Sequence, residues 1–305
     1  MINIYFNAAT SDNIRRQQLY NGQLFVYSPS AATTALCELA RGLAEEAFAP
    51  YDPRDAQNFL SVTQYVDTLA TLKPGFIHHP ESKPLIREIL RDLGCDLEKT
   101  YFDLPRLRTV THSDYLTSGL AYVFKPHRDL WYSTPRCQIN WWLPVYPIES
   151  ENAMAFHVGY WGRPLKNSSA TFNYQEWNRE GRTMAAQQIG TDLRKQSAAL
   201  EPVKMEPELR VIAESGGLLM FSAAHLHSTV PNTSERTRLS IDFRTVHLDE
   251  LIDGGAPNLD SASTGTTIRD YVRGTDFDLV PDEILGYYEA ETPTDEELSP
   301  QLRQT

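Results

Sequence analysis

A histidine and an aspartate two residues apart, His127 and Asp129, follow a strand-like run at 119–125. Side chains at positions i and i+2 of an extended strand point to the same side of the backbone. An imidazole nitrogen and a carboxylate oxygen can therefore reach one point in space. One more histidine from a neighbouring strand would complete a facial set of metal ligands, with the opposite face left open for reactants. A set of two histidines and one carboxylate suits non-haem Fe(II).

The pattern alone is not specific, because His-x-Asp also occurs at 112–114 and 247–249. What distinguishes His127 and Asp129 is the order of the segments that follow them. A strand-like run at 138–145 comes first, and the segment 216–240 comes much later. The triplet at 247–249 has no such segments after it, and the triplet at 112–114 has an additional expected strand, 119–124, interposed.

The expected strand 238–244 separates its side chains by parity. Leu239, Ile241 and Phe243 point one way, and the other face carries Arg238, Ser240, Asp242 and Arg244. A solvated polar face is the ordinary interpretation, since charged residues are mostly exposed. Inside a barrel, however, the polar face can line a cavity. An arginine with a hydroxyl two residues later can then bind a carboxylate, because the guanidinium pairs with it bidentately.

Composition narrows the class of protein. The chain has 305 residues, 41% of them hydrophobic and 22% charged, which is typical of a globular protein that can bury a full core. No run of apolar residues is long enough for a bilayer and no secretory signal is visible, so we expect no membrane partner and a cytoplasmic location. The net charge of −12 argues against a nucleic-acid partner. Three widely spaced cysteines do not form a disulfide framework.

The order of expected elements predicts a single domain over 1–288 that is mainly β with helical cover, an α+β protein. Residues 1–104 are expected to be mostly helical support, and residues 105–250 to form the β core. An insertion or lid over 158–207 interrupts this core, and an acidic flexible tail is expected at 289–305. Within these regions we expect helices at about 30–48, 54–72, 81–93 and 183–199. We expect strands at 21–27, 106–111, 119–125, 137–145, 209–214 and 218–222. A hairpin turn at 215–217 is expected to join the last two strands.

Together, His127-x-Asp129, the tryptophan-bearing strand 138–145 and the segment from His227 to Arg238 resemble the phytanoyl-CoA dioxygenase-like branch of the Fe(II)/2-oxoglutarate-dependent oxygenases. In that family an arginine follows the second histidine by eleven residues, as Arg238 follows His227. The resemblance implies a double-stranded β-helix (jelly-roll) core flanked by N-terminal helices. It covers roughly 119–157 and 216–246. The family's Pro-Gly-Ser-His-type turn is replaced here by Val158-Gly159-Tyr160-Trp161, and the insertion after it is long.

Carried over by position, the resemblance implies Fe(II) ligands at His127, Asp129 and His227, with 2-oxoglutarate and O2 as cosubstrates. Arg238 would bind the far carboxylate of 2-oxoglutarate, with Ser240 and Trp142 beside it. His225 competes with His227, because both lie on one face of a strand, and the Ser-Thr-Val-Pro-Asn sequence that follows favours His227. Halogenases of the family replace the carboxylate by a small residue, so Asp129 favours hydroxylation.

The expected function is hydroxylation of a small polar metabolite or natural-product intermediate by a dioxygenase. Two alternatives remain: a cupin-type metal enzyme that does not use 2-oxoglutarate, and a non-catalytic jelly-roll module that binds a polar ligand. The sequence does not indicate an oligomeric state. Aromatic and cationic residues that flank the site are candidates for substrate contact and, equally, for packing: Trp131, Tyr132, Tyr160, Trp161, Arg163 and Trp177.

Overall fold

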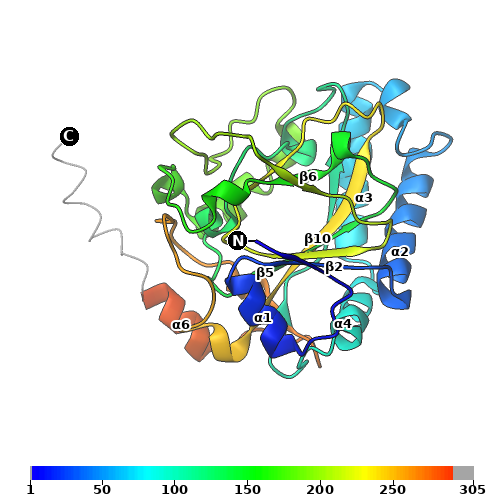
Figure 1. Ribbon diagram of the computed structural model, residues 1–305. Helices are drawn as coiled ribbons and strands as arrows, with labels where there is room; N and C mark the ends of the chain where they lie inside the picture. The colour runs from blue at the N-terminus through cyan, green and yellow to red at the C-terminus, as the bar shows by residue number, and fades with distance from the viewer. Residues whose placement is uncertain (1, 291–305) are drawn as a thin grey trace.

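A computed structural model describes residues 2–290 (Figure 1). The helices are α1 (Asp12–Tyr20), α2 (Ala31–Phe48), α3 (Val62–Ile77), α4 (Ser82–Asp92), α5 (Tyr174–Glu176) and α6 (Asp282–Ala290). The strands are β1 (Ile4–Phe6), β2 (Leu24–Tyr27), β3 (Thr100–Phe102), β4 (Arg106–Val110), β5 (Ile139–Pro144), β6 (Met154–Phe156), β7 (Leu209–Val211), β8 (Leu218–Ser222), β9 (His227–Thr229), β10 (Arg238–His247) and β11 (Val272–Arg273).

The strands form two sheets whose connectivity confirms the jelly-roll expectation. In the large sheet β4, β10, β5 and β8 lie side by side in that order, and all three pairings are antiparallel. The small sheet has the order β7-β6-β9, and the segment at His127 extends it through an antiparallel bridge to His227. From β4 onward the chain alternates between the sheets, except that the consecutive strands β6 and β7 both belong to the small sheet, which is the connectivity of a double-stranded β-helix. Strands from outside 105–250, namely β1, β2, β3 and β11, widen the large sheet.

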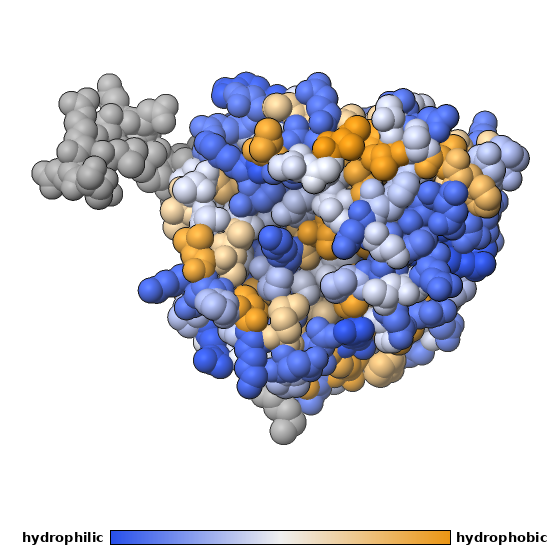
Figure 2. All heavy atoms as spheres, turned by 90° about the horizontal axis from the view of Figure 1, so that it is seen from above, coloured by the Kyte–Doolittle hydropathy of each residue, from blue (hydrophilic) through white to orange (hydrophobic). Residues whose placement is uncertain are grey.

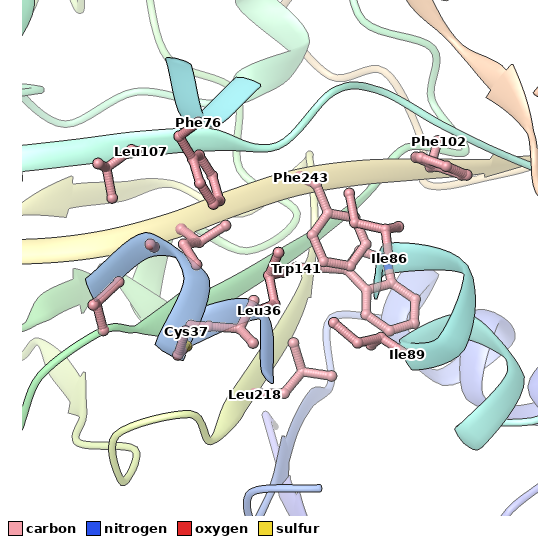
Figure 3. Close-up of a cluster of buried hydrophobic side chains, with 14 of the residues drawn as sticks. Leu36, Cys37, Phe76, Ile86, Ile89, Phe102, Leu107, Trp141, Leu218 and Phe243 are labelled. Carbon is pink, nitrogen blue, oxygen red and sulfur yellow. The ribbon is translucent and has the colours of Figure 1, made fainter. Parts of the chain in front are cut away.

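The main hydrophobic core lies between the outer face of the large sheet and the N-terminal helices α2, α3 and α4, which cover that face (Figure 1). Leu239, Ile241 and Phe243 of β10 are all buried there, as their parity predicts. Figure 3 shows Trp141 and Phe243 packed together in this layer, with their rings stacked at a centroid distance of 5.2 Å. The outer face therefore holds the fold together and leaves the inner face available for a site.

Local sequence explains why the covering helices begin where they do. Ser30 and Ser61 are the N-caps of α2 and α3, and each forms a capping box with the residue three positions later. The expected helix at 54–72 is shifted: a 3-10 turn occupies 56–58 and α3 continues to Ile77 past Pro74. Proline removes one helical hydrogen bond, but the last turn buries Phe76 completely and so compensates for that loss.

Three other local predictions are wrong. No strand forms at 119–125; Gly119 has φ +58° and begins a 3-10 turn whose glycine lies against backbone oxygens of the insertion. No long helix covers 183–199, which contains one 3-10 turn and then Gly190 at φ +81°. The turn at 215–217 does not make a hairpin, because β7 belongs to the small sheet and β8 to the large one.

One expectation concerns the C-terminal end of the chain. The acidic tail expected at 289–305 lies outside the described residues, apart from the end of α6 at Ala290. Among residues 2–290, no helix has the length and apolar character that crossing a bilayer requires. Figure 2 shows a mostly hydrophilic face that is hollowed near its centre, where hydrophobic side chains are visible.

Candidate metal centre and the cavity around it

The structure brings His127, Asp129 and His227 together between the two sheets. One potential ligand atom from each residue lies within 4.8 Å of the others. Asp129 Oδ1 is 3.4 Å from His127 Nε2 and 4.0 Å from His227 Nε2. His227 begins β9, and the backbone bridge between residues 127 and 227 fixes the relative position of the two histidines. Two imidazoles and one carboxylate thus converge as the sequence predicted.

Hydrogen bonds on the far side of each imidazole set its tautomer. Nδ1 of His127 lies 2.8 Å from the carbonyl oxygen of Lys125, and Nδ1 of His227 lies 3.0 Å from that of His225. A carbonyl only accepts, so in the neutral form of each ring Nδ1 carries the proton and Nε2 is left as the atom that can bind a metal. Outer hydrogen bonds of this kind orient the histidine ligands of metal sites.

The electrostatics of the three groups also suit a cation. Burial lowers the pKa of His227 to about 4, and repulsion from His127 adds to the effect. Burial would raise the pKa of Asp129, but the nearby side chain of His127 and the charge of His227 outweigh it and lower this pKa to about 2. At neutral pH the centre therefore holds a neutral imidazole at His227 and an ionised carboxylate, which are the forms that bind divalent metals.

His225 lies outside this centre. Its ring packs against Trp161, with a centroid distance of 4.5 Å, and against the edge of Phe156. Burial, followed by the nearby His227, lowers the pKa of His225 to about 3, and its Nε2 is buried with no hydrogen-bond partner. Geometry thus separates the two histidines that the sequence left in competition, and favours His227 as the ligand.

The inner face of β5 extends the site away from the metal ligands. Asn140 influences Asp129 directly, since its side chain helps to lower the pKa of that carboxylate. The Oδ1 atom of Asn140 accepts a hydrogen bond of 3.0 Å from Gln138, and its buried Nδ2 has no partner at hydrogen-bonding distance and angle. The sequence interpretation missed Asn140, although its parity with Trp142 places both on this face.

Arg238 lies farther along the same inner surface and is almost fully buried. Its guanidinium carbon lies 5.6 Å from the ring centroid of Trp142, and Nη1 donates to the carbonyl oxygens of Asn152 and Ala153. Across residues 2–290 no carboxylate lies within salt-bridge distance of Arg238, and its Nε has no partner. Burial lowers the pKa of Arg238 to about 10, which leaves it charged at neutral pH.

Ser240, two residues after Arg238, is also completely buried, and its Oγ has no hydrogen-bond partner. The expected polar face of β10 is therefore internal rather than solvated. Arg238, Ser240 and Trp142, which the sequence grouped as a carboxylate site, occur on adjacent strands of one inner surface. Buried donors without partners are uncommon in folded proteins, so these atoms are available to a bound group.

The other two polar residues of this face of β10, Asp242 and Arg244, form a ladder of alternating charges with residues of 103–108. The order along the ladder is Arg106, Asp103, Arg244, Asp242, Arg108. Successive pairs are separated by 2.9, 3.1, 2.9 and 2.5 Å. Three guanidiniums face two carboxylates, and burial raises the pKa of Asp103 to about 8, so the ladder carries at least one surplus positive charge at neutral pH. Its two ends are the most exposed members, with 29% and 32% of their side-chain surface accessible, against 15% or less for the others.

The aromatic residues predicted to contact substrate have different environments. Tyr132 borders the metal centre, with its ring centroid 5.6 Å from that of His127. Trp131 is completely buried and donates from Nε1 to Asp260, so its role is packing. Trp161 packs on His225 and on the turn at Gly22, where an added Cβ would lie 2.4 Å from the indole.

The remaining candidates belong to the insertion. Tyr160 accepts a hydrogen bond of 2.8 Å from the backbone of Lys204, and the exposed Arg163 lies 5.6 Å above the ring of Tyr160. Trp177 faces the guanidinium of Arg194 at 5.0 Å. Contacts within the insertion therefore account for these three side chains.

The backbone between the two ligands of 127–129 is anchored from behind. Arg128 is 1% exposed and donates from Nη2 to the carbonyl oxygens of Tyr160 and Arg163, at 2.8 and 2.7 Å. Its Nη1 donates to the carbonyl oxygen of Ala224, on the chain that leads to His227. One side chain thus connects the metal turn, the second ligand segment and the insertion.

No family model matches the chain, and no curated protein matches it in sequence. Solved structures similar to it include the epimerase SnoN in complex with Fe3+, α-ketoglutarate and nogalamycin RO, with 17% identity, a TM-score of 0.41, and coverage of 84% of this chain and 97% of SnoN. EvdO2 from Micromonospora carbonacea var. aurantiaca, complexed with 2-oxoglutarate, has 14% identity, a TM-score of 0.45, and coverage of 78% and 92%. ThoJ, described as a non-heme monooxygenase, has 12% identity, a TM-score of 0.41, and coverage of 76% of each chain. At these identities the likeness concerns the chain trace, and no residue role is carried over from these proteins.

Proposed function

We propose that this protein is an Fe(II)- and 2-oxoglutarate-dependent oxygenase that hydroxylates a C–H bond of a small polar metabolite. The observation that carries the proposal is the pairing of two features within one internal surface. One is the triad of His127, Asp129 and His227. The other is Arg238, a buried arginine that no carboxylate of the described chain neutralises.

The spacing between these features suits a short dicarboxylate. Asn140 stands beside Asp129, Arg238 lies over Trp142, and the two β5 residues are one strand repeat apart. Side chains two residues apart on a strand are separated by about 7 Å. A ligand with one carboxylate near the metal and another at Arg238 would span this interval and satisfy the unpaired Nε of Arg238 and Oγ of Ser240.

The residues present also fit the metal. Two neutral imidazole nitrogens and one carboxylate are the donor set typical of non-haem Fe(II) oxygenases, with three further positions for cosubstrate and O2. Bound iron with 2-oxoglutarate and O2 would convert a substrate C–H to C–OH, with succinate and CO2 as the other products. The protein binds and orients the reactants: Arg238 and Ser240 hold the distal carboxylate, and Asn140 lies beside the ligand Asp129.

The charged ladder supports a polar substrate. Arg106 and Arg108 end the ladder with one carboxylate partner each and with the most accessible side chains. Arg108 also lies 5.6 Å from the ring centroid of Phe124, which stacks on His127 at 4.9 Å. A surplus positive charge this close to the metal centre favours a substrate with an anionic or hydrogen-bond-accepting group. Tyr132, beside His127, is the aromatic residue best placed to contact such a substrate.

The test is turnover of 2-oxoglutarate. Purified protein would be supplied with Fe(II), 2-oxoglutarate and O2 together with a panel of small polar metabolites, and succinate and hydroxylated product would be measured. We expect succinate formation that requires Fe(II), is stimulated by one class of metabolite and disappears in Asp129→Ala. Metal-dependent conversion without consumption of 2-oxoglutarate would favour the cupin-type alternative. Ligand binding without any conversion would favour the non-catalytic module.

A further inference from the structure

Arg108 is an accessible guanidinium with only one of its sides engaged. It belongs to β4, which pairs with β10 alone among the described strands. Its Nε and Nη2 donate to the two carboxylate oxygens of Asp242, over 2.5 and 3.2 Å. Within residues 2–290 its Nη1 has no hydrogen-bond partner, and 32% of the side-chain surface is accessible. The free side of this guanidinium can therefore receive a second acceptor.

The protein supplies too little negative charge at this place. Asp242 also pairs with Arg244, whose Nη2 lies 2.9 Å from its Oδ2, so one carboxylate serves two guanidiniums. Lys73 of α3 donates from Nζ to the carbonyl oxygen of Leu120 over 2.5 Å, and no carboxylate of residues 2–290 lies within salt-bridge distance of it. Burial, followed by the nearby charge of Arg108, lowers the pKa of Lys73 to about 7. In a chain with a net charge of −12, such a local surplus of cations attracts anions selectively.

Arg108 lies between the metal centre and the position proposed for the cosubstrate. Its guanidinium carbon is 5.6 Å from the ring centroid of Phe124, and that ring stacks on the ligand His127 at 4.9 Å. The register of β4 and β10 places Arg108 opposite Ser240, two residues from Arg238. Residues in such a diagonal relationship are about 7–8 Å apart. The accessible Arg108 and the buried Arg238 are therefore two neighbouring but separate arginines.

We infer that the substrate carries an anionic group, either a carboxylate or a phosphate ester, that binds the free side of Arg108 while 2-oxoglutarate occupies Arg238. Both kinds of group present oxygen acceptors to the N–H donors of a guanidinium. The inference rests on the proposed function and assigns a class to its substrate. One internal surface then holds two anions, the cosubstrate in the buried position and the substrate in the accessible one.

Anion binding can be measured without metal or cosubstrate. Arg238→Ala removes the other free arginine of the inner surface, so isothermal titration of this variant with inorganic phosphate and with acetate would report on Arg108. Adding Arg108→Met should weaken the binding of the preferred anion by about tenfold or more, because charge-assisted hydrogen bonds are lost. Adding Arg108→Lys instead should retain part of the affinity. The anion that binds more tightly identifies the group as a phosphate ester or a carboxylate.

A matched control lies at the far edge of the same sheet. Arg273 of β11 has 28% of its side-chain surface accessible, and it pairs with Asp276 and Asp278. Arg273→Met in the Arg238→Ala background should leave the affinity for both anions unchanged. The melting temperature of each variant checks that it is folded.

Turnover tests the same assignment with pairs of compounds that differ in charge, namely carboxylic acids with their amides and phosphate esters with their parent alcohols. Succinate formation should be stimulated by the anionic member of a pair. Arg108→Met should raise KM for that member by about tenfold or more and leave KM for 2-oxoglutarate unchanged.

The outcomes are separable. Equal anion affinity with and without Arg108, an equal loss in Arg273→Met, or stimulation by neutral compounds alone would overturn the inference. A KM for 2-oxoglutarate that rises in Arg108→Met as it does in Arg238→Ala would also overturn it, because Arg108 would then belong to the cosubstrate site. Absence of succinate with every compound would contradict the proposed function, while the phosphate and acetate titrations would still decide whether Arg108 binds an anion.

Discussion

Arg128 and Asp260 form an ion pair behind the metal turn, with Nε 3.2 Å from Oδ2 and with side chains that are 1% and 3% exposed. Asp260 also accepts hydrogen bonds from Nε1 of Trp131 and from the backbone of Leu165. The pair therefore ties the residue between two ligands to the loop after β10 and to the insertion. The metal centre is held from a side that no substrate can reach.

Removing one partner of this pair should damage the whole site. Asp260→Ala leaves a buried guanidinium without a counter-charge, and loss of one partner of a buried pair costs about 3–5 kcal/mol of unfolding free energy. Chemical denaturation should show a loss of this size together with weaker metal binding. Glu180→Ala breaks an exposed ion pair in which the side chain of Arg179 is 72% accessible and that of Glu180 is 65% accessible. The unfolding free energy of this variant should stay within about 0.5 kcal/mol of wild type. Similar losses in both variants would contradict the anchoring role.

The three ligands should be individually necessary for metal-dependent activity. His127→Ala, Asp129→Ala and His227→Ala each remove one donor from the group, so Fe(II)-dependent succinate formation should vanish in all three. His112→Ala and His247→Ala are controls, because these histidines belong to the other His-x-Asp triplets and lie outside the group. Full activity in His227→Ala with loss in His225→Ala would transfer the ligand assignment to His225.

Arg238 should control affinity for 2-oxoglutarate while leaving Fe(II) binding intact. Loss of a buried charge-assisted pair typically costs about 2–5 kcal/mol, or roughly thirtyfold to several thousandfold in affinity. Arg238→Ala should raise the apparent requirement for 2-oxoglutarate by such a factor, and Arg238→Lys should recover only part, because a point charge cannot pair bidentately. Arg236, which is 54% exposed beside Asp55, is the control. An Arg238→Ala variant whose activity does not depend on the concentration of 2-oxoglutarate would favour the cupin-type alternative.

Acid should destabilise the metal-free protein through its buried neutral histidines. The folded-state pKa values of His225 and His227 are lowered to about 3 and about 4, whereas unfolded histidine titrates near pH 6.5. Below about pH 6.5 the unfolded chain therefore binds more protons than the folded protein. The contribution of these histidines to the free energy of unfolding is complete above that pH and falls as the pH decreases toward 4. Each such histidine contributes a slope of about 1.4 kcal/mol per pH unit. Urea denaturation of His225→Phe between pH 7 and 4 should show a shallower decline than wild type.

Much of the site could be predicted from sequence because its signals are local. The i, i+2 spacing of His127 and Asp129 identified the pair, and the structure brings the two together, although Asp129 begins a 3-10 turn at 129–132 rather than continuing a strand. The parity of Arg238 and Ser240 follows from strand geometry, and both side chains are buried. The sequence after His227 already favoured it over His225, and the structure adds that His227 belongs to the converging group while the ring of His225 packs against Trp161. The buried hydrogen bond from the hydroxyl of Tyr271 to Oε1 of Gln138 was not predictable, because a contact between residues 133 positions apart leaves no local pattern.

The predictions of local structure that were wrong also depend on contacts between residues distant in sequence. The alternation at 119–125 is typical of a strand, but Gly119 packs against backbone oxygens of Ala185 and Gln188, and this contact from the insertion determines the local backbone. The Ser-Gly-Gly turn at 215–217 specifies a reversal of the chain without specifying the sheet to which the next strand belongs. Turn residues report local conformation, whereas the two-sheet topology depends on pairings distant in sequence.

The unpaired donors on the inner surface connect the stability of the fold to the ligand proposed above. Nε of Arg238, Oγ of Ser240 and Nδ2 of Asn140 are buried without partners, and each such group destabilises the native state relative to a hydrated unfolded chain. A ligand that satisfies them binds only the native state, so its concentration sets part of the thermal tolerance of the protein. Under the proposed function, the fraction of folded protein would therefore rise with the concentration of 2-oxoglutarate.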